Sequence, residues 1–253
     1  ELIDFYLERM VSLPLNILED QDIHPRLCYA ALRCVETLCR DWGPIIQSKY
    51  HVRILPVLAK LSCHPEHHRN QMHQAMAIID CCHKCTPENL EPFLFAIVLK
   101  VRELCQSKSF LARAWAVSAL GTVASSAQDR FTQFYETAME TLKDLLMRKY
   151  QVTRYNFKAK CLESISLIAA VIGKEKFQND ANQVMEVLVS ILSCLKYHST
   201  KIIIFKALEN LFHCLGQDFS LFLKDLMPVL LLSCKLVGKK KNKGQSPQRS
   251  AEN

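Results

Sequence analysis

The sequence predicts an all-helical protein built from a repeated pair of antiparallel helices, and three observations support this. Apolar residues recur every three or four positions over long segments, which is the period of an amphipathic helix. Glycine is scarce, with six among 253 residues, and no segment alternates apolar and polar residues between turn signals as a strand would. The third observation is an internal repeat of 41–45 residues.

The repeat is clearest in the second helix of each pair. A small or apolar residue returns at intervals of 44, 41, 45 and 43, at Ala31, Ala75, Ala116, Cys161 and Ile204. A small side chain at this place lets the paired helix approach closely. A two-helix unit of this length is typical of HEAT and armadillo repeats, so the predicted fold is a HEAT-repeat α-solenoid that winds as a right-handed superhelix.

Five complete units and one half unit follow from this register. Residues 1–237 hold the repeats, and residues 238–253 are predicted to be a basic, polar, disordered tail. In three first helices a proline inside an apolar triplet predicts a bend, at Pro14, Pro56 and Pro228. The predicted helix pairs are 1–18 with 25–40, 47–63 with 67–84, 87–106 with 109–126, 131–148 with 155–172, and 178–196 with 200–215, followed by a single helix at 219–236.

The segment 165–192 predicts how one unit joins the next. Gly173 ends an apolar run and is expected to cap a helix at its C-terminus. The polar run 174–180 is expected to be the link, so that it holds no catalytic group. Asp180 is expected to accept backbone N–H groups where the next helix starts, because four donors lack partners there.

Charge and cysteine content exclude several classes of function. Of the formal charge of +7, residues 238–253 carry five basic residues against Glu252, or +5 − 1 = +4. The body is therefore only mildly basic, which argues against direct nucleic-acid binding. No apolar run approaches 18 residues, which argues against a membrane span. The twelve cysteines lie mostly on apolar helical faces and are expected to be free, buried thiols in a reducing compartment.

Two histidine- and cysteine-rich clusters were weighed as a metal site. The first is "CHPEHHRNQMH" at 63–73, and the second is "CCHKC" at 81–85, where Cys82 and Cys85 have CxxC spacing. Since 14 residues of helix between His68 and Cys82 span about 21 Å, one helix does not bring both clusters to one ion. We therefore predict no metal, no cofactor and no catalytic residue, because nothing supplies an oxyanion hole beside a Cys–His pair.

Basic residues open each second helix at intervals of 43, 44, 45 and 43, at Arg26, Arg69, Arg113, Lys158 and Lys201. They are interpreted either as a structural ladder of ion pairs or as a line of cations that faces a partner. Trp115 is interpreted either as packing against a neighbouring unit or as an anchor for a bound peptide. The candidate partner-binding residues are therefore Arg113, Trp115, Lys158 and Lys201. Lys239, Lys240, Lys241 and Lys243 form a candidate basic localisation patch.

With the repeats in register, the sequence resembles the importin-beta (karyopherin-beta) nuclear transport receptors, nearest the beta-3 branch, as a fragment from the middle of the HEAT array. The resemblance covers residues 1–232 in a consistent order. It is carried by "HPRLCYAALRCVETLCRDWGP" at 24–44, "VLKVREL" at 98–104, "RFTQFYETAMETLKDLL" at 130–146, "ESISLIAAVIGKEKFQNDANQVMEVL" at 163–188 and "LGQDFSLFLKDLMPVLL" at 215–231.

The resemblance implies a receptor that binds protein cargo, through basic or acidic segments, on its inner surface. It also implies contact with Phe-Gly nucleoporins, release of cargo by the small GTPase Ran, and shuttling between cytoplasm and nucleus. The sequence departs from the family in its length, in the absence of the repeats expected to hold Ran, and in the lysine cluster after Leu236. The alternative function is a HEAT-repeat scaffold in a static protein complex.

Overall fold

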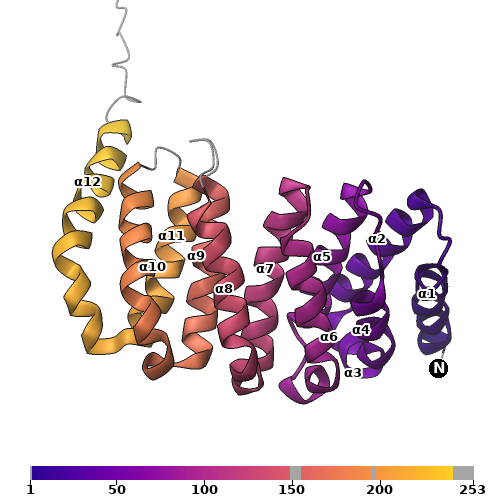
Figure 1. The fold of residues 1–253 in the computed structure, drawn as a ribbon. Coiled ribbons are helices and arrows are strands. Elements are labelled where there is room, and N and C mark those ends of the chain that lie inside the picture. The colour runs from indigo at the N-terminus through magenta and orange to yellow at the C-terminus, as the bar shows by residue number, and fades with distance from the viewer. Residues whose placement is uncertain (1, 149–154, 195–197, 242–253) are drawn as a thin grey trace, which may run out of the picture.

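The computed structural model describes residues 2–148, 155–194 and 198–241, and within these ranges it contains helices and no strand (Figure 1). None of the helices in these ranges combines the length and the apolar character needed to cross a membrane. The elements are α1 (Leu2–Leu18), α2 (Pro25–Asp41), α3 (Gly43–Lys49), α4 (His51–Lys60), α5 (His68–Cys82), α6 (Pro87–Cys105), α7 (Phe110–Ala127), η1 (Gln128–Phe134), α8 (Tyr135–Met147), α9 (Tyr155–Ile172), α10 (Lys174–Cys194), α11 (His198–Leu215), η3 (Gly216–Phe222) and α12 (Leu223–Lys241).

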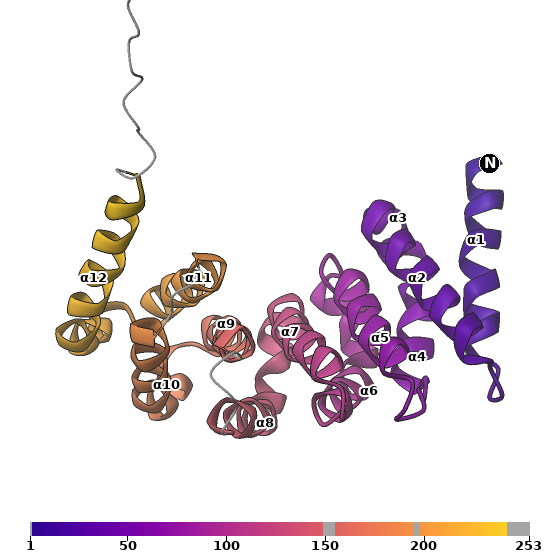
Figure 2. The same cartoon turned by 90° about the horizontal axis from the view of Figure 1, so that it is seen from above.

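The helices stack side by side in one open arc (Figures 1 and 2). The second helices of the pairs contact one another in the sequence α2, α5, α7, α9, α11, and the first helices α4, α6 and α8 form a parallel row. Figure 2 shows the row of second helices along the inner side of the arc and the row of first helices along the outer side. The predicted all-helical solenoid is therefore confirmed.

The core follows the repeat seen in the sequence. All five marker residues of the second helices are buried, from Ala31 to Ile204. The small residues matter most between α7 and α9, because a Cβ added at Gly121 would lie 2.9 Å from the Cα of Ser164. Ser164 Oγ also donates a hydrogen bond of 2.7 Å to the carbonyl of Val117. These two helices therefore pack with their backbones unusually close.

The first helix of the second unit differs from its prediction. Residues 47–63 were expected to form one helix, but the chain forms α3 and α4, which meet at Tyr50, and α4 ends at Lys60. Helix α3 starts earlier than predicted because Pro44 lies in its first turn, where the missing N–H costs nothing and the fixed φ favours the helix. The fourth unit likewise opens with the 3₁₀ helix η1 before α8.

The connection between α9 and α10 is shorter than predicted, because only Gly173 separates the two helices. Gly173 adopts a φ of +85° and its N–H bonds to the carbonyl of Ala169, which confirms the expected helix cap. The expected link at 174–180 was wrong, because α10 begins at Lys174 and turns the fully buried Phe177 into the core. Asp180 therefore lies inside α10 and caps nothing. Its carboxylate accepts hydrogen bonds of 2.6 Å from Tyr135 Oη and from Lys143 Nζ.

The C-terminal helix is longer than predicted. Helix α12 continues to Lys241, so Lys239, Lys240 and Lys241 are helical and do not belong to a polar tail. Lysine has a good helix propensity, which makes this extension favourable. Lys243 and the remainder of the predicted tail, 242–253, lie outside the described residues.

A buried acid links the first two units. Glu36 of α2 is completely buried, and its carboxylate lies 2.6 Å from His73 Nδ1 of α5 and 3.4 Å from the guanidinium of Arg33. The His73 ring in turn packs edge-to-face on Tyr29, with centroids 5.0 Å apart. Burial raises the pKa of the Glu36 carboxyl, and the contact with His73 opposes this shift.

The raised pKa of Glu36 predicts a pH-dependent stability. The folded chain binds this proton more tightly than the unfolded chain, so the stabilisation is fully present below the unfolded pKa of about 4.3 and is lost as the pH rises through the folded pKa. We expect Glu36→Gln to remove this decline when urea unfolding is measured between pH 4 and pH 7. As a control, Glu8→Gln should change the slope with the opposite sign, because the contact with Arg53 lowers the pKa of Glu8. Equal slopes for wild type and Glu36→Gln would contradict the prediction.

Candidate protein-binding surface

The inner face of the arc is formed by the second helices α2, α5, α7, α9 and α11 (Figure 2). Each of these helices packs its other sides against neighbouring helices, so its solvent-exposed positions recur every three or four residues along one stripe. We call this set of stripes the inner face, and it is defined here by Thr37, Met72, Met76, Asp80, Leu111, Trp115, Ser118, Lys160, Glu163, Ile202, Phe205, Glu209 and Phe212.

Trp115 is held at the centre of the inner face by the neighbouring unit. It is half-buried and packs on the core of α7. Lys160 of α9 places its Nζ 5.1 Å from the centroid of the Trp115 ring and donates a hydrogen bond of 3.2 Å to Ser118 Oγ. A cation over an indole face is attractive, so Lys160 fixes the ring while leaving part of it open to solvent. Trp115 thus lies against a neighbouring unit and stays partly exposed to solvent.

The basic residues that open the second helices do not form one exposed line. The Nη1 amino group of the Arg113 guanidinium donates to the carbonyls of Ser107 and Lys108, at 2.6 and 3.1 Å, and so ties the α6–α7 connection to α7. Lys201 is only 6% exposed and Lys158 is half-buried, whereas Arg26 is exposed. Arg113, Lys158 and Lys201 therefore do not form a fully exposed row, which favours the structural interpretation over a line of cations that faces a partner.

An acidic row that sequence reasoning missed crosses the inner face. Asp80, Glu163 and Glu209 each follow a residue of the stripe by three or four positions, on α5, α9 and α11. Asp80 lies 3.8 Å from Arg40, and burial is the main cause of its raised pKa. Glu163 is half-buried and Glu209 is exposed. No regular signal in the sequence marks these acids, because Asp80 and Glu209 lie five residues after the markers Ala75 and Ile204 whereas Glu163 lies two residues after Cys161.

Beside the acidic row runs an apolar band. Met72 and Met76 on α5 are half-buried, as is Trp115 on α7. Leu111 is 60% exposed, and Ile202 on α11 is 58% exposed. Large apolar side chains this open to solvent, next to carboxylates, can hold a partner segment that alternates aliphatic and cationic side chains.

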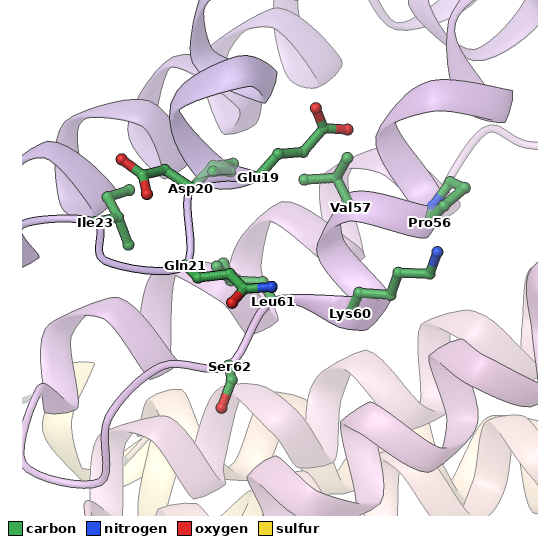
Figure 3. A pocket seen from close by; sticks show the side chains of 10 residues that line it. Glu19, Asp20, Gln21, Ile23, Pro56, Val57, Lys60, Leu61 and Ser62 are labelled. Atoms are coloured by element: carbon green, nitrogen blue, oxygen red, sulfur yellow. The ribbon is translucent and has the colours of Figure 1, made fainter.

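Grooves also lie between first helices. The groove in Figure 3 has a volume of about 580 Å³ and separates the end of α1 and the α1–α2 connection from α4. Gln21 lies on one side of it, and Pro56, Val57 and Lys60 lie on the other. A second groove, of about 730 Å³, lies between α10 and the η3–α12 segment, where it is lined by Met185, Val189, Leu221, Phe222 and Pro228, with polar groups at its edge.

The histidine and cysteine clusters stay apart. His64 and His67 lie in the α4–α5 connection with ring centroids 5.4 Å apart, whereas Cys82 is buried at the far end of α5. Within the ranges that the structure describes, no three side chains of His, Cys, Asp or Glu converge as ligands of a metal ion.

The amino-acid sequence is similar to those of known importins. No family model matches the chain. The chain is 27% identical over 216 residues to importin subunit beta-3 of Saccharomyces cerevisiae. This alignment covers 85% of this chain and 20% of that protein. It is also 27% identical over 146 residues to a probable importin-5 homolog of Dictyostelium discoideum, in an alignment that covers 57% of this chain and 14% of that protein. The chain thus spans about a fifth or less of the length of these curated relatives.

Solved karyopherin structures share the fold. Kap121p bound to Pho4p matches with a TM-score of 0.80 and 25% identity, over 92% of this chain and 22% of that one. Kap121p bound to Nup53p matches with a TM-score of 0.79 and 25% identity, over 91% and 21%. The open stack of helix pairs is therefore an α-solenoid of HEAT repeats. The relatives are importins and karyopherins, which are transport receptors and not enzymes, and they confirm the resemblance to the importin-beta family.

Proposed function

We propose that the chain is a protein-binding segment of an importin-beta-type nuclear transport receptor that carries protein cargo through the nuclear pore. The observation that carries the proposal is the match, over 91–92% of the chain, to Kap121p in complexes with protein partners. The alternative is a HEAT-repeat scaffold in a static complex, which would share the fold and the surface chemistry.

The inner face is the proposed cargo site. A cargo segment that alternates lysine and aliphatic residues would place its cations on the acidic row at Asp80, Glu163 and Glu209 and its apolar side chains on the band around Trp115. Among the candidate residues from the sequence, Trp115 keeps its proposed role as an anchor. Arg113, Lys158 and Lys201 are proposed to support the surface from below rather than to meet the partner.

Replacing Trp115 by alanine should weaken binding of such a segment by about tenfold or more, because truncating a central aromatic anchor commonly costs at least 1–2 kcal/mol. The measurement is fluorescence anisotropy with a labelled lysine- and isoleucine-containing peptide. Phe95→Ala is the matched control, since Phe95 is an aromatic residue on the outer helix α6 and is 70% exposed. Unchanged affinity in a folded Trp115→Ala protein would argue against this surface.

Binding of Phe-Gly peptides separates a carrier from a scaffold. A carrier segment is proposed to hold such peptides weakly in the grooves between first helices, with the phenyl ring against Val57 or Val189. Amide chemical shifts should then move at these grooves and not on the inner face, and no shift at either groove would favour the scaffold. Three further proposals follow from the family resemblance alone. They are shuttling between cytoplasm and nucleus, Ran binding by the full-length receptor, and a localisation role for Lys239, Lys240, Lys241 and Lys243.

A further inference from the structure

Two cysteines from different repeat units share one cavity. Cys28 lies in the first turn of α2, and Cys63 lies in the connection between α4 and α5. Both are free thiols, and both line a cavity of about 420 Å³. The two thiols influence each other, because Cys63 lowers the pKa of Cys28 and Cys28 raises the pKa of Cys63. Asn70 Nδ2 donates a bond of 3.1 Å to the carbonyl of Pro25 and so holds the connection against the start of α2.

A cysteine contact between α2 and α5 is closed to solvent. Cys39 and Cys81 also form a thiol contact across α2 and α5, but they are 1% and 0% exposed. Cys63, by contrast, is partly exposed, and Cys28, although only 3% exposed, lines the same cavity. Cys28 and Cys63 therefore share one cavity that is open to solvent, and access to a thiol is a condition for its oxidation.

We propose that Cys28 and Cys63 are a redox-modification site, at which hydrogen peroxide forms a reversible disulfide between the first and second repeat units. The Cys28 thiolate attacks one peroxide oxygen, the O–O bond breaks, and the released hydroxide leaves as water after it takes a proton. The Cys63 thiol then attacks the sulfenic sulfur, the S–S bond forms, the S–O bond breaks, and a second water leaves with the Cys63 proton. Two thiols lose two electrons, and one peroxide is reduced to two waters.

The local structure favours Cys28 as the attacking sulfur. The neighbouring Cys63 thiol lowers the pKa of Cys28, which increases the thiolate fraction. Bond formation requires the two sulfurs to close to about 2.05 Å. Cys63 lies outside any helix, so the connection between α4 and α5 supplies the movement. The resulting crosslink shortens the loop that the unfolded chain is free to explore, which predicts a higher thermal midpoint.

Peptide mapping tests the proposal on the whole chain. After treatment with hydrogen peroxide, free thiols are blocked with N-ethylmaleimide and the protein is cut with trypsin without reduction. The tryptic peptides 27–33 and 61–69 contain one cysteine each, so their crosslink is unambiguous. We expect the 27–33/61–69 crosslink to be the dominant disulfide, to disappear with dithiothreitol, and to raise the thermal midpoint by several degrees.

Variants identify the roles of the two sulfurs. Cys28→Ser and Cys63→Ser should each abolish the crosslink and the shift in the thermal midpoint, and Cys63→Ser should leave a sulfenic acid on Cys28 that dimedone traps. Cys34→Ser removes an exposed thiol on the same helix and should leave the crosslink unchanged. Recovery of 27–33 and 61–69 as separate maleimide adducts after peroxide, or a dominant crosslink of either peptide to another cysteine, would overturn the proposal.

Discussion

Replacing Phe157 by alanine is expected to lower the free energy of unfolding by about 3–5 kcal/mol. Phe157 opens α9 and is only 1% exposed. Its ring packs on Phe110 of the preceding unit, with centroids 5.2 Å apart. The loss combines the transfer free energy of the ring with the cavity left between α7 and α9, which relaxes only partly because Gly121 and Ser164 already bring the two backbones close.

Chemical denaturation followed by circular dichroism measures this effect. Leu111→Ala is the matched control, because Leu111 is a large apolar residue of α7 that is 60% exposed, and its truncation should change the stability by no more than about 0.5 kcal/mol. If Phe157→Ala lost no more stability than Leu111→Ala, the α7–α9 contact would not be the rigid centre of the array that the burial indicates.

Replacing Asp180 by alanine is expected to cost about 2–3 kcal/mol, which is less than a fully buried ion pair would because Lys143 is 31% exposed. The substitution removes the acceptor of both 2.6 Å hydrogen bonds and leaves Tyr135 Oη and Lys143 Nζ without that partner. Burial and the bond to Asp180 together raise the pKa of Tyr135, which reflects how closely the phenol and the carboxylate are held. The three groups join α8 to α10, so their loss weakens the contact between the fourth and fifth units.

A double-mutant cycle isolates this contact. Asp180→Ala and Tyr135→Phe should be non-additive in urea denaturation, with a coupling energy of at least about 0.5 kcal/mol. Asp144→Ala is the control, because its pair with Arg148 lies on the surface of α8 and should contribute less than about 0.5 kcal/mol. A loss for Asp180→Ala as small as that for Asp144→Ala would show that the network does not stabilise the joint.

The candidate site was predictable in part. Trp115 stood out in the sequence because an indole interrupted a stripe of small residues, and the structure places it on the inner face beside Lys160. For Arg113 and Lys201 the regular spacing left a structural and a partner-facing role open, and the carbonyl contacts of Arg113 and the burial of Lys201 favour the structural one. Spacing reports which positions are equivalent in successive units, but it does not report whether a side chain at that position reaches solvent or a carbonyl.

The helices and their repeat were determined by the sequence alone. Apolar periodicity, the recurring small residue from Ala31 to Ile204 and the cap at Gly173 act within a few residues of one another, so local physics specifies them. The errors at 43–50 and 174–180 concern where a helix begins. Pro44 favours the early start of α3 locally, whereas α10 starts early and places Phe177 in the core formed with its neighbours.

The contacts between units were decided only by the tertiary structure. Glu36 and His73 are 37 residues apart, Asp180 and Tyr135 are 45 apart, and Cys28 and Cys63, which line one cavity, come from different units. Each pairing depends on how far one helix slides and rotates along the next as the stack closes. That lateral register results from the packing of whole helix surfaces, in which many side chains interlock at once, and no period within a single helix encodes it.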